Sequence, residues 1–270
     1  MKKIIICCNY NEEKTNNLKD CLRSLAKIKD KDTIIGFIDN KSIDHSRDII
    51  SEYMSFGVID YCIFAKENLG KAKALSSLFL SIINAQKLID PIRKLDIVIH
   101  LDSDITLHKN FLIDAERFLS SGSNILYTSE LSLTKNKFTQ SSYHTFNRTA
   151  SIFEITEDNR KFLTYYKNTK GICGCSIAMR VGDFLRVGMY DLHLGKNKTS
   201  AIYGGDDAVL LFKLNHEFPH LNTIISVSDW NVHPETKDKA YQDWKNMVNQ
   251  TMAKGGFGNS MIPDKGFYDN

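Results

Sequence analysis

Two aspartates, Asp102 and Asp104, stand one residue apart at the end of the mostly apolar run 95–101, where they can hold a divalent cation. Such a run predicts a buried strand, and acidic side chains at the carboxyl end of a strand in an open α/β sheet lie where ligands bind. Carboxylate oxygens are hard ligands, which Mg²⁺ and Mn²⁺ accept. A second pair of this spacing, Asp30 and Asp32, follows no apolar run, so we assign it no site.

Length, composition and charge favour a soluble globular protein. The 270 residues are 42% hydrophobic and 25% charged, which suits one large α/β domain or two small ones. A formal net charge of +3 gives no reason to expect a nucleic-acid partner. The first apolar run stops at Cys8, too early for a signal peptide, and no run is long enough to cross a bilayer. We therefore expect a cytoplasmic protein whose six cysteines are reduced.

Strands and helices alternate through the first half of the chain. Strands are predicted at 3–8, 33–39, 58–65 and 95–101, and the helices between them at 14–28, 46–56 and 71–88. Three βα units in about 100 residues predict a parallel, doubly wound sheet. The second half is less regular: strands are predicted at 172–180 and 223–227 and helices at 208–214 and from 240, whereas 130–170 has no clear period.

Four segments, in this order, resemble motifs of the GT-A glycosyltransferases, closest to the large inverting group called family 2. They are the end of the opening strand with Asn9-Tyr10-Asn11-Glu12, then Ile38–Asp44, Asn68–Ala74 and Leu101–Asp104. Each motif is weak alone, and the shared order makes the match specific. The resemblance implies an α/β GT-A fold, in which helices flank a doubly wound, mixed and mostly parallel sheet, and it implies a nucleotide-sugar donor.

Two later segments resemble a different set of enzymes. Residues Tyr203–Ala208 are similar to the Trp-Gly-Gly-Glu-Asp-Asp segment of β-1,4-galactosyltransferase-like enzymes, and Val232–Lys239 is similar to their later metal-binding histidine segment. This chain has Tyr203 in place of Trp, Asp206 in place of Glu and Ala208 in place of Asp. These departures bear on the choice of acceptor more than on the chemistry.

The resemblance assigns roles to individual side chains. Asp104 and His233, with Asp102 acting directly or through water, would hold Mn²⁺ or Mg²⁺, and an imidazole ligand favours Mn²⁺. Asp207 would be the general base for the acceptor hydroxyl, and Asp206 would orient a donor or acceptor hydroxyl. The donor contacts would come from Asn9, Tyr10, Asp39, Asn68, Gly70, Lys71 and Ser103, and the acceptor contacts from Tyr203, Gly204, Gly205 and Trp230.

These residues also have plainer interpretations. An aspartate such as Asp39 often opens a turn, and a lysine such as Lys71 is common at the start of a surface helix. Asp206 and Asp207 can be a pair that caps a helix. His233, which precedes a proline, can be an ordinary loop residue.

The expected protein is a metal-dependent inverting glycosyltransferase with a glycan or glycolipid acceptor, of the kind used in polysaccharide biosynthesis. It would be one domain, with a nucleotide-sugar-binding half at 1–104, an acceptor and catalytic half at 105–240, and a C-terminal helix and flexible tail at 241–270. The family also leaves open a peripheral association with the inner membrane face. Two alternatives remain: a nucleotidyltransferase, although residues 9–13 are not the Gly-rich basic loop usual there, and a nucleotide-sugar-binding module without catalysis.

Overall fold

The computed structural model describes residues 1–12, 16–122, 124–132, 151–166, 175–190 and 206–232. The strands of this part are β1 (Lys3–Asn9), β2 (Thr33–Asp39), β3 (Tyr61–Phe64), β4 (Ile97–Asp102), β5 (Ile125–Ser132), β6 (Ser151–Glu157), β7 (Arg160–Tyr166), β8 (Ser176–Arg180) and β9 (Asn222–Val232). The helices are α1 (Asn17–Ile28), α2 (Ser46–Ser55), α3 (Lys71–Gln86), α4 (Phe111–Ser120), α5 (Val181–Arg186) and α6 (Asp206–Glu217). All seven elements predicted between residues 3 and 101 are present. The helix expected from residue 240 lies outside the described ranges.

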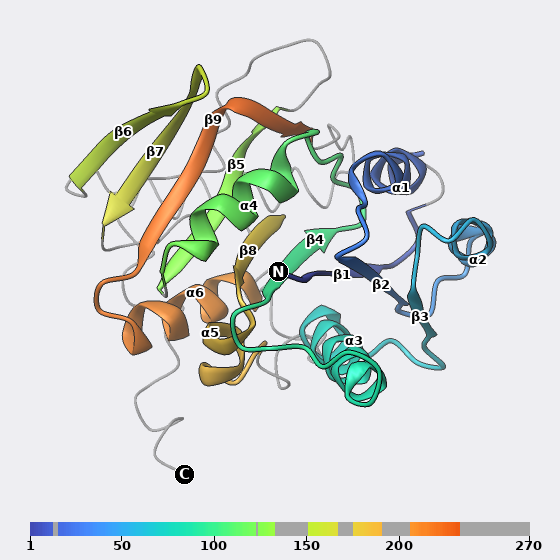
Figure 1. Ribbon diagram of the computed structural model, residues 1–270. Helices are drawn as coiled ribbons and strands as arrows, with labels where there is room; N and C mark the ends of the chain where they lie inside the picture. The colour runs from blue at the N-terminus through green and yellow to red at the C-terminus, as the bar shows by residue number, and fades with distance from the viewer. Residues whose placement is uncertain (13–15, 123, 133–150, 167–174, 191–205, 233–270) are drawn as a thin grey trace, which may run out of the picture.

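Among the described residues, nine strands form one sheet in the order β3-β2-β1-β4-β8-β5-β9-β7-β6 (Figure 1). The pairs β1–β2, β2–β3, β1–β4 and β5–β9 are parallel, whereas β8 and β7 run against the strands beside them. All strands except β7 and β8 therefore point the same way. This confirms the prediction of a mixed, mostly parallel α/β sheet flanked by helices.

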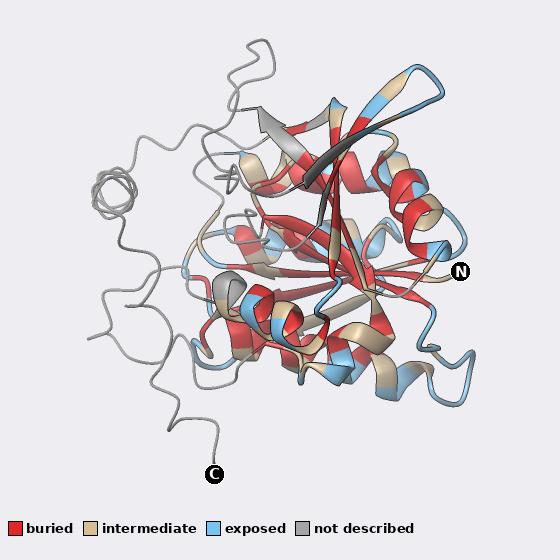
Figure 2. Cartoon of the chain, turned by 90° about the vertical axis from the view of Figure 1, so that its left-hand side faces the viewer, coloured by how far each residue is buried: buried red, intermediate tan, exposed pale blue. Residues whose placement is uncertain are grey.

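The two faces of the sheet are covered by different helices. Helices α1, α2 and α4 pack on one face, and α3, α5 and α6 pack on the other (Figure 1). Alternate side chains of β1 serve both cores, with Ile5 and Cys7 on the first face and Ile4 and Ile6 on the second. Figure 2 shows the buried residues gathered in the strands and on the inward sides of the helices. Burial on both faces explains why these strands are continuous apolar runs in the sequence.

The chain reverses its direction of winding at β1. It passes from β1 to β2 and β3 on one side, and then returns through α3 to β4 on the other side. In open α/β sheets, ligands bind beyond the carboxyl ends of the strands at such a reversal. The register places Asn9 beside Asp39 and Cys8 beside Asp102, so the ends of β1, β2 and β4 are level.

The second half contains a hairpin that the sequence analysis did not predict. The last paired residues of strands β6 and β7 are Glu157 and Arg160, so Asp158 and Asn159 form a two-residue loop. Both loop residues have positive φ, 50° and 60°, as a type I′ hairpin turn requires. Strand β7 pairs with β9 and joins the hairpin to the sheet.

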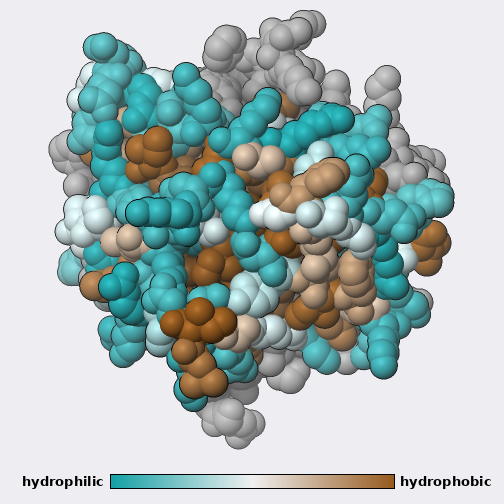
Figure 3. Space-filling view, turned by 45° about the vertical axis from the view of Figure 1, so that its right-hand side comes forward, coloured by the Kyte–Doolittle hydropathy of each residue, from teal (hydrophilic) through white to brown (hydrophobic). Residues whose placement is uncertain are grey.

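The surface of the described part is mixed in character. Several large apolar side chains are exposed, among them Ile43, Phe56, Leu88, Ile89 and Leu95. Figure 3 shows apolar residues in several separate patches on one face, with hydrophilic residues between them. Within the described residues, no helix has the length and apolar character needed to cross a bilayer. Among the described residues, the five cysteines form no disulfide.

Candidate functional site

The turn after β2 is organised around the carboxylate of Asp39, which is fully buried. Its Oδ1 accepts hydrogen bonds from the Ser42 backbone N–H (3.0 Å) and from Arg47 Nε (2.7 Å). Its Oδ2 accepts one from Asn9 Nδ2 at 3.1 Å, which joins the ends of β1 and β2. Arg47 also donates to the Ala65 carbonyl oxygen at 2.8 Å, beyond the end of β3. Asp39 therefore holds the turn in shape, and its predicted contact with a nucleotide stays a prediction.

The loop before α3 is fixed by a second set of amide contacts. Asn40 donates to Asn68 Oδ1 at 2.9 Å and accepts from the Leu69 backbone N–H at 2.8 Å. The same Asn68 oxygen accepts from the Gly70 backbone N–H at 2.9 Å. Gly70 has φ +78°, a left-handed conformation that favours glycine, and α3 begins at the next residue. The motif Asn68–Gly70 thus positions the first turn of α3.

Asp102, at the end of β4, is held by two side chains. Lys71 Nζ lies 2.7 Å from its Oδ1, and His100 Nε2 lies 3.1 Å from the same oxygen. Burial acts to raise the pKa of Asp102, but the Lys71 charge and the nearby His100 ring outweigh burial and hold this pKa well below its usual range. The Asp102 carboxylate is therefore ionised at neutral pH. An ionised, partly exposed carboxylate with hard oxygen atoms fits the divalent cation that the sequence predicts here.

Ser103 and Asp104 form the turn that follows β4. Ser103 is buried, Asp104 is partly buried, and the Ile105 backbone N–H donates to the Asp102 carbonyl oxygen at 3.2 Å. Two residues after Asp104, Thr106 pairs with Val232 through two backbone hydrogen bonds of 2.9 and 2.8 Å. The end of β9 is therefore fixed beside the segment that follows Asp104.

Tyr10 follows β1 and is 49% exposed, which leaves much of its ring available for contact with a flat partner. The segment beyond it is tied to the turn after β2, because the Asn11 side-chain oxygen accepts from the Ile43 backbone N–H at 2.8 Å. The Asn11 backbone N–H donates to Ser42 Oγ at 3.0 Å. Tyr10 thus lies on the same edge of the sheet as Asp39.

The remaining predicted residues fall partly outside the described ranges. Asp206 and Asp207 are the first two residues of α6, and Trp230 is part of β9, but the positions of their side chains are not described. Tyr203, Gly204, Gly205 and His233, together with the tail 241–270, lie outside the described residues.

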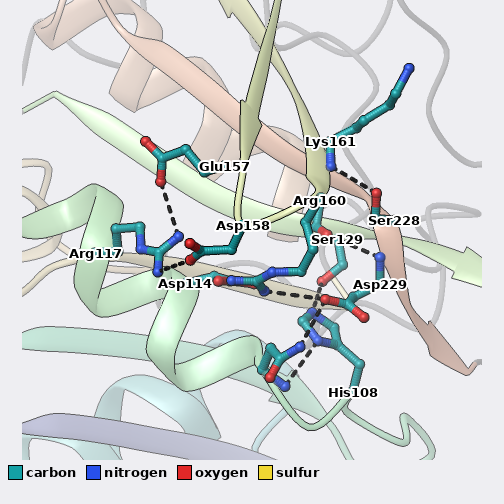
Figure 4. A network of polar contacts seen from close by, with 12 residues as sticks. His108, Asp114, Arg117, Ser129, Glu157, Asp158, Arg160, Lys161, Ser228 and Asp229 are labelled. Atoms are coloured by element: carbon teal, nitrogen blue, oxygen red, sulfur yellow. Dashed lines mark hydrogen bonds and ion pairs between the residues drawn. The ribbon is translucent and has the colours of Figure 1, made fainter.

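A separate charged cluster joins α4 to the hairpin and β9 (Figure 4). Potential ligand atoms of His108, Asp114 and Asp229 all lie within 4.8 Å of one another, a spacing that a metal ion could span. The cation among them, however, is the Arg160 guanidinium, which lies 2.7 Å from Asp114 Oδ2 and 3.2 Å from Asp229 Oδ2. We therefore assign the cluster a structural role, in which Arg160 neutralises the two carboxylates.

The imidazole in this cluster has its own partners. Nε2 of His108 lies 2.9 Å from Ser129 Oγ, and Nδ1 accepts from the Asn110 backbone N–H at 3.3 Å. Burial lowers the pKa of His108 to about 4, while Asp229 acts to raise it and Arg160 acts to lower it. The ring is therefore neutral at neutral pH.

Arg47, His100 and Tyr190 contribute to the site and were not predicted as site residues. His100 is two residues before Asp102 on the same strand, so the two side chains share one face of the sheet. That period-two spacing was a signal in the sequence. Tyr190, which contacts His100, has no such signal, because the two residues are 90 positions apart.

Comparisons with known proteins agree with the fold. The family model described as "Glycosyl transferase family 2" matches residues 4–188, which is more than half of the chain. Curated protein sequences give no match. Among solved structures, TarS 1–349 of S. aureus in complex with UDP-GlcNAc is similar, with a TM-score of 0.58 and 16% identity. That alignment covers 90% of this chain and 61% of TarS 1–349.

Two further structures are similar in fold. GalNAc-T7 with UDP, GalNAc and Mn²⁺ gives a TM-score of 0.59 at 15% identity, covering 87% of this chain and 44% of that one. The mannosyltransferase PcManGT from Pyrobaculum calidifontis, with GDP-Man and Mn²⁺, gives a TM-score of 0.60 at 13% identity, covering 94% of this chain and 64% of that one. This chain thus spans less than two thirds of each of these three proteins. At such identities the likeness shows the fold alone.

Proposed function

Because the chain belongs to glycosyl transferase family 2, we propose that it transfers a sugar from a nucleotide-sugar donor to a hydroxyl of a glycan or glycolipid. The observation that carries the proposal is the alignment of Asn9, Asp39 and Asp102 at the ends of β1, β2 and β4, where the sheet reverses its winding. Proteins of the same fold are seen with UDP-GlcNAc and GDP-Man, donors of this chemical class.

The donor would lie along this edge. The Lys71 ammonium and the N–H groups of the first turn of α3 suit a diphosphate, because both attract negative charge. The exposed ring of Tyr10 offers a flat surface for the base, beside the turn that Asn9 and Asp39 hold. Asn68 and Gly70 set the position of Lys71, and Ser103 would contact the donor from the turn after β4.

The cation, Mn²⁺ in preference to Mg²⁺, is assigned to Asp104 and His233, with Asp102 acting directly or through water. The bridge between Thr106 and Val232 supports this assignment, because it holds the residue that precedes His233 in the sequence beside the segment that follows Asp104. Two of the similar structures contain Mn²⁺. When bound, the ion neutralises charge on the departing nucleoside diphosphate.

The acceptor chemistry is assigned to the start of α6. Asp207 would take the proton of the attacking hydroxyl as general base, and Asp206 would orient a hydroxyl group. A single displacement of this kind inverts the anomeric centre. Gly204 and Gly205 would let the backbone approach the sugar closely, and Tyr203 and Trp230 would contact the acceptor.

We also propose that residues 1–270 form one domain, with donor binding in 1–104 and acceptor binding with catalysis in 105–240. The support is the continuous sheet, whose β3, β2, β1 and β4 come from the first part and whose β8, β5, β9, β7 and β6 come from the second.

A panel of nucleotide sugars, each with and without Mn²⁺, tests the proposal. A true donor should raise the melting temperature by mass action, and turnover should release a nucleoside diphosphate. Release of pyrophosphate would indicate the nucleotidyltransferase instead. A donor that raises the melting temperature but is never turned over with any acceptor would indicate the binding module.

A further inference from the structure

An imidazole is buried in the strand that carries the Asp102–Asp104 pair. His100 is 2% exposed, although its neighbours along β4 are almost all apolar. A polar ring at such a position is costly unless both nitrogens have partners. Nδ1 lies 2.6 Å from the Tyr190 hydroxyl, and Nε2 lies 3.1 Å from Asp102 Oδ1, a close polar contact without the alignment of a hydrogen bond. His100 therefore connects a buried tyrosine to the predicted cation site.

The contacts of the His100 ring favour one tautomer. A carboxylate oxygen accepts hydrogen bonds, so the short distance between Asp102 Oδ1 and Nε2 favours the tautomer whose proton is on Nε2. Nδ1 is then the acceptor, and the Tyr190 hydroxyl donates to it. Tyr190 thus acts on Asp102 through the orientation and protonation pattern of one ring.

Tyr190 is brought to His100 by an unusual turn. Gly188 and Met189, which precede it, both have left-handed backbones, with φ of 73° and 60°. This conformation is unfavourable for methionine, so the surrounding structure must hold it. The tyrosine ring is 1% exposed and packs edge-on against Phe184, with ring centroids 5.6 Å apart, and against His100 at 5.3 Å. Packing fixes the ring and places its hydroxyl beside His100 Nδ1.

The contacts of Asp102 are directional. Lys71 Nζ and His100 Nε2 both lie close to the same oxygen, Oδ1. Neither of these two contacts uses Oδ2. When a side chain that contacts a metal-ligating carboxylate or imidazole is removed, metal affinity typically falls 10- to 100-fold.

We propose that Tyr190 and His100 are positioning residues, which hold Asp102 so that its Oδ2 faces the cation and diphosphate of the donor. The inference rests on the function proposed above, since it needs a cation site at the end of β4. It adds to that function a pair of residues that contact neither donor nor acceptor and still set the affinity for both cation and donor.

Three substitutions separate positioning from packing. Tyr190→Phe removes only the hydroxyl and keeps the ring against Phe184. His100→Leu removes both nitrogens at similar volume, whereas His100→Gln keeps an amide N–H able to reach Asp102. The matched control is Phe184→Leu, which loosens the same aromatic cluster, including the Phe79 contact at 5.2 Å. This substitution removes none of the polar groups of Tyr190, His100 and Asp102.

The measurement is Mn²⁺ binding, followed by the EPR signal of the free ion, first with the metal alone and then with UDP or GDP. We expect Tyr190→Phe and His100→Leu to weaken binding about 10-fold or more, and His100→Gln to restore much of it. Phe184→Leu should lower the melting temperature and leave Mn²⁺ affinity unchanged. In turnover, the same two weakened variants should raise the KM for donor more than they lower kcat. ¹⁵N NMR of wild-type His100 should show the proton on Nε2.

The outcomes distinguish this inference from the proposed function. Equal Mn²⁺ affinity in wild type, Tyr190→Phe and His100→Leu would overturn the positioning role while leaving the cation site intact. Equal losses in Phe184→Leu and Tyr190→Phe would also overturn it, because packing alone would then explain the change. If Asp104→Asn binds Mn²⁺ as tightly as wild type, the cation site itself is wrong and the inference falls with it.

Discussion

Acidification should weaken the fold through His108, and the structure gives the size of the effect. Burial lowers the pKa of this imidazole to about 4 in the folded protein, against about 6.5 in the unfolded chain. Because the folded value is the lower one, the unfolded chain binds more protons between these two pH values. The contribution of His108 is thus complete above pH 6.5 and is lost as the pH falls toward 4. The difference between the folded and unfolded pKa values of His108 corresponds to roughly 3 kcal/mol of unfolding free energy.

Urea unfolding of wild type and His108→Gln at pH values between 4 and 7 measures this contribution. Glutamine keeps an amide that can meet Ser129 Oγ, and both proteins keep Asp114, Asp229 and Arg160, so the difference between them isolates the imidazole. The unfolding free energy of wild type should fall more steeply, by about 3 kcal/mol over this range. Parallel curves for the two proteins would refute the reasoning, because they would mean that His108 has the same pKa folded and unfolded.

Three further predictions concern the proposed chemistry and the charged cluster. Asp207→Asn should lower kcat by about 10²-fold, because it removes the proposed general base. Donor affinity, measured by calorimetry, should change little, and an unchanged kcat would place the base elsewhere. His233→Ala should weaken the Mn²⁺ dependence of donor binding in thermal shift, and an unaltered dependence would remove this residue from the site. Arg160→Met should lower the unfolding free energy by about 3 kcal/mol in urea, because Asp114 and Asp229 would face each other without their cation. A loss below about 1 kcal/mol would show that the guanidinium is not needed there.

Sequence patterns identified the first half of the fold largely because β1, β2 and β4 are buried on both faces. The run Thr33–Asp39 was predicted with the bounds that β2 has. The β6–β7 hairpin was missed, although Asp158 and Asn159 are residues that tolerate positive φ at low cost. Helix α4 was missed as well, even though Phe111, Leu112 and Ala115 are buried at helical spacing.

The candidate site was also predicted in part. Asp39 and Asp102 were predicted as site residues because their position follows from the strand itself, and the structure places both at strand ends, while their roles stay predictions. Arg47, His100 and Tyr190 were missed because their roles depend on contacts between distant parts of the chain. Nothing local marks Tyr190 as the partner of His100, since only the packing of the turn after α5 against β4 brings them together. Whether Asp207 and His233 join this site stays a prediction.

The most direct test of the central claim is nucleoside diphosphate release by wild type and Asp104→Asn, measured with each nucleotide sugar, Mn²⁺ and a glycan acceptor. The account predicts release from at least one donor by wild type, and a loss of about 10²-fold or more in a folded Asp104→Asn protein, because the charge of the leaving group is then no longer neutralised. Equal rates in the two proteins, or release by neither with any donor, would contradict it.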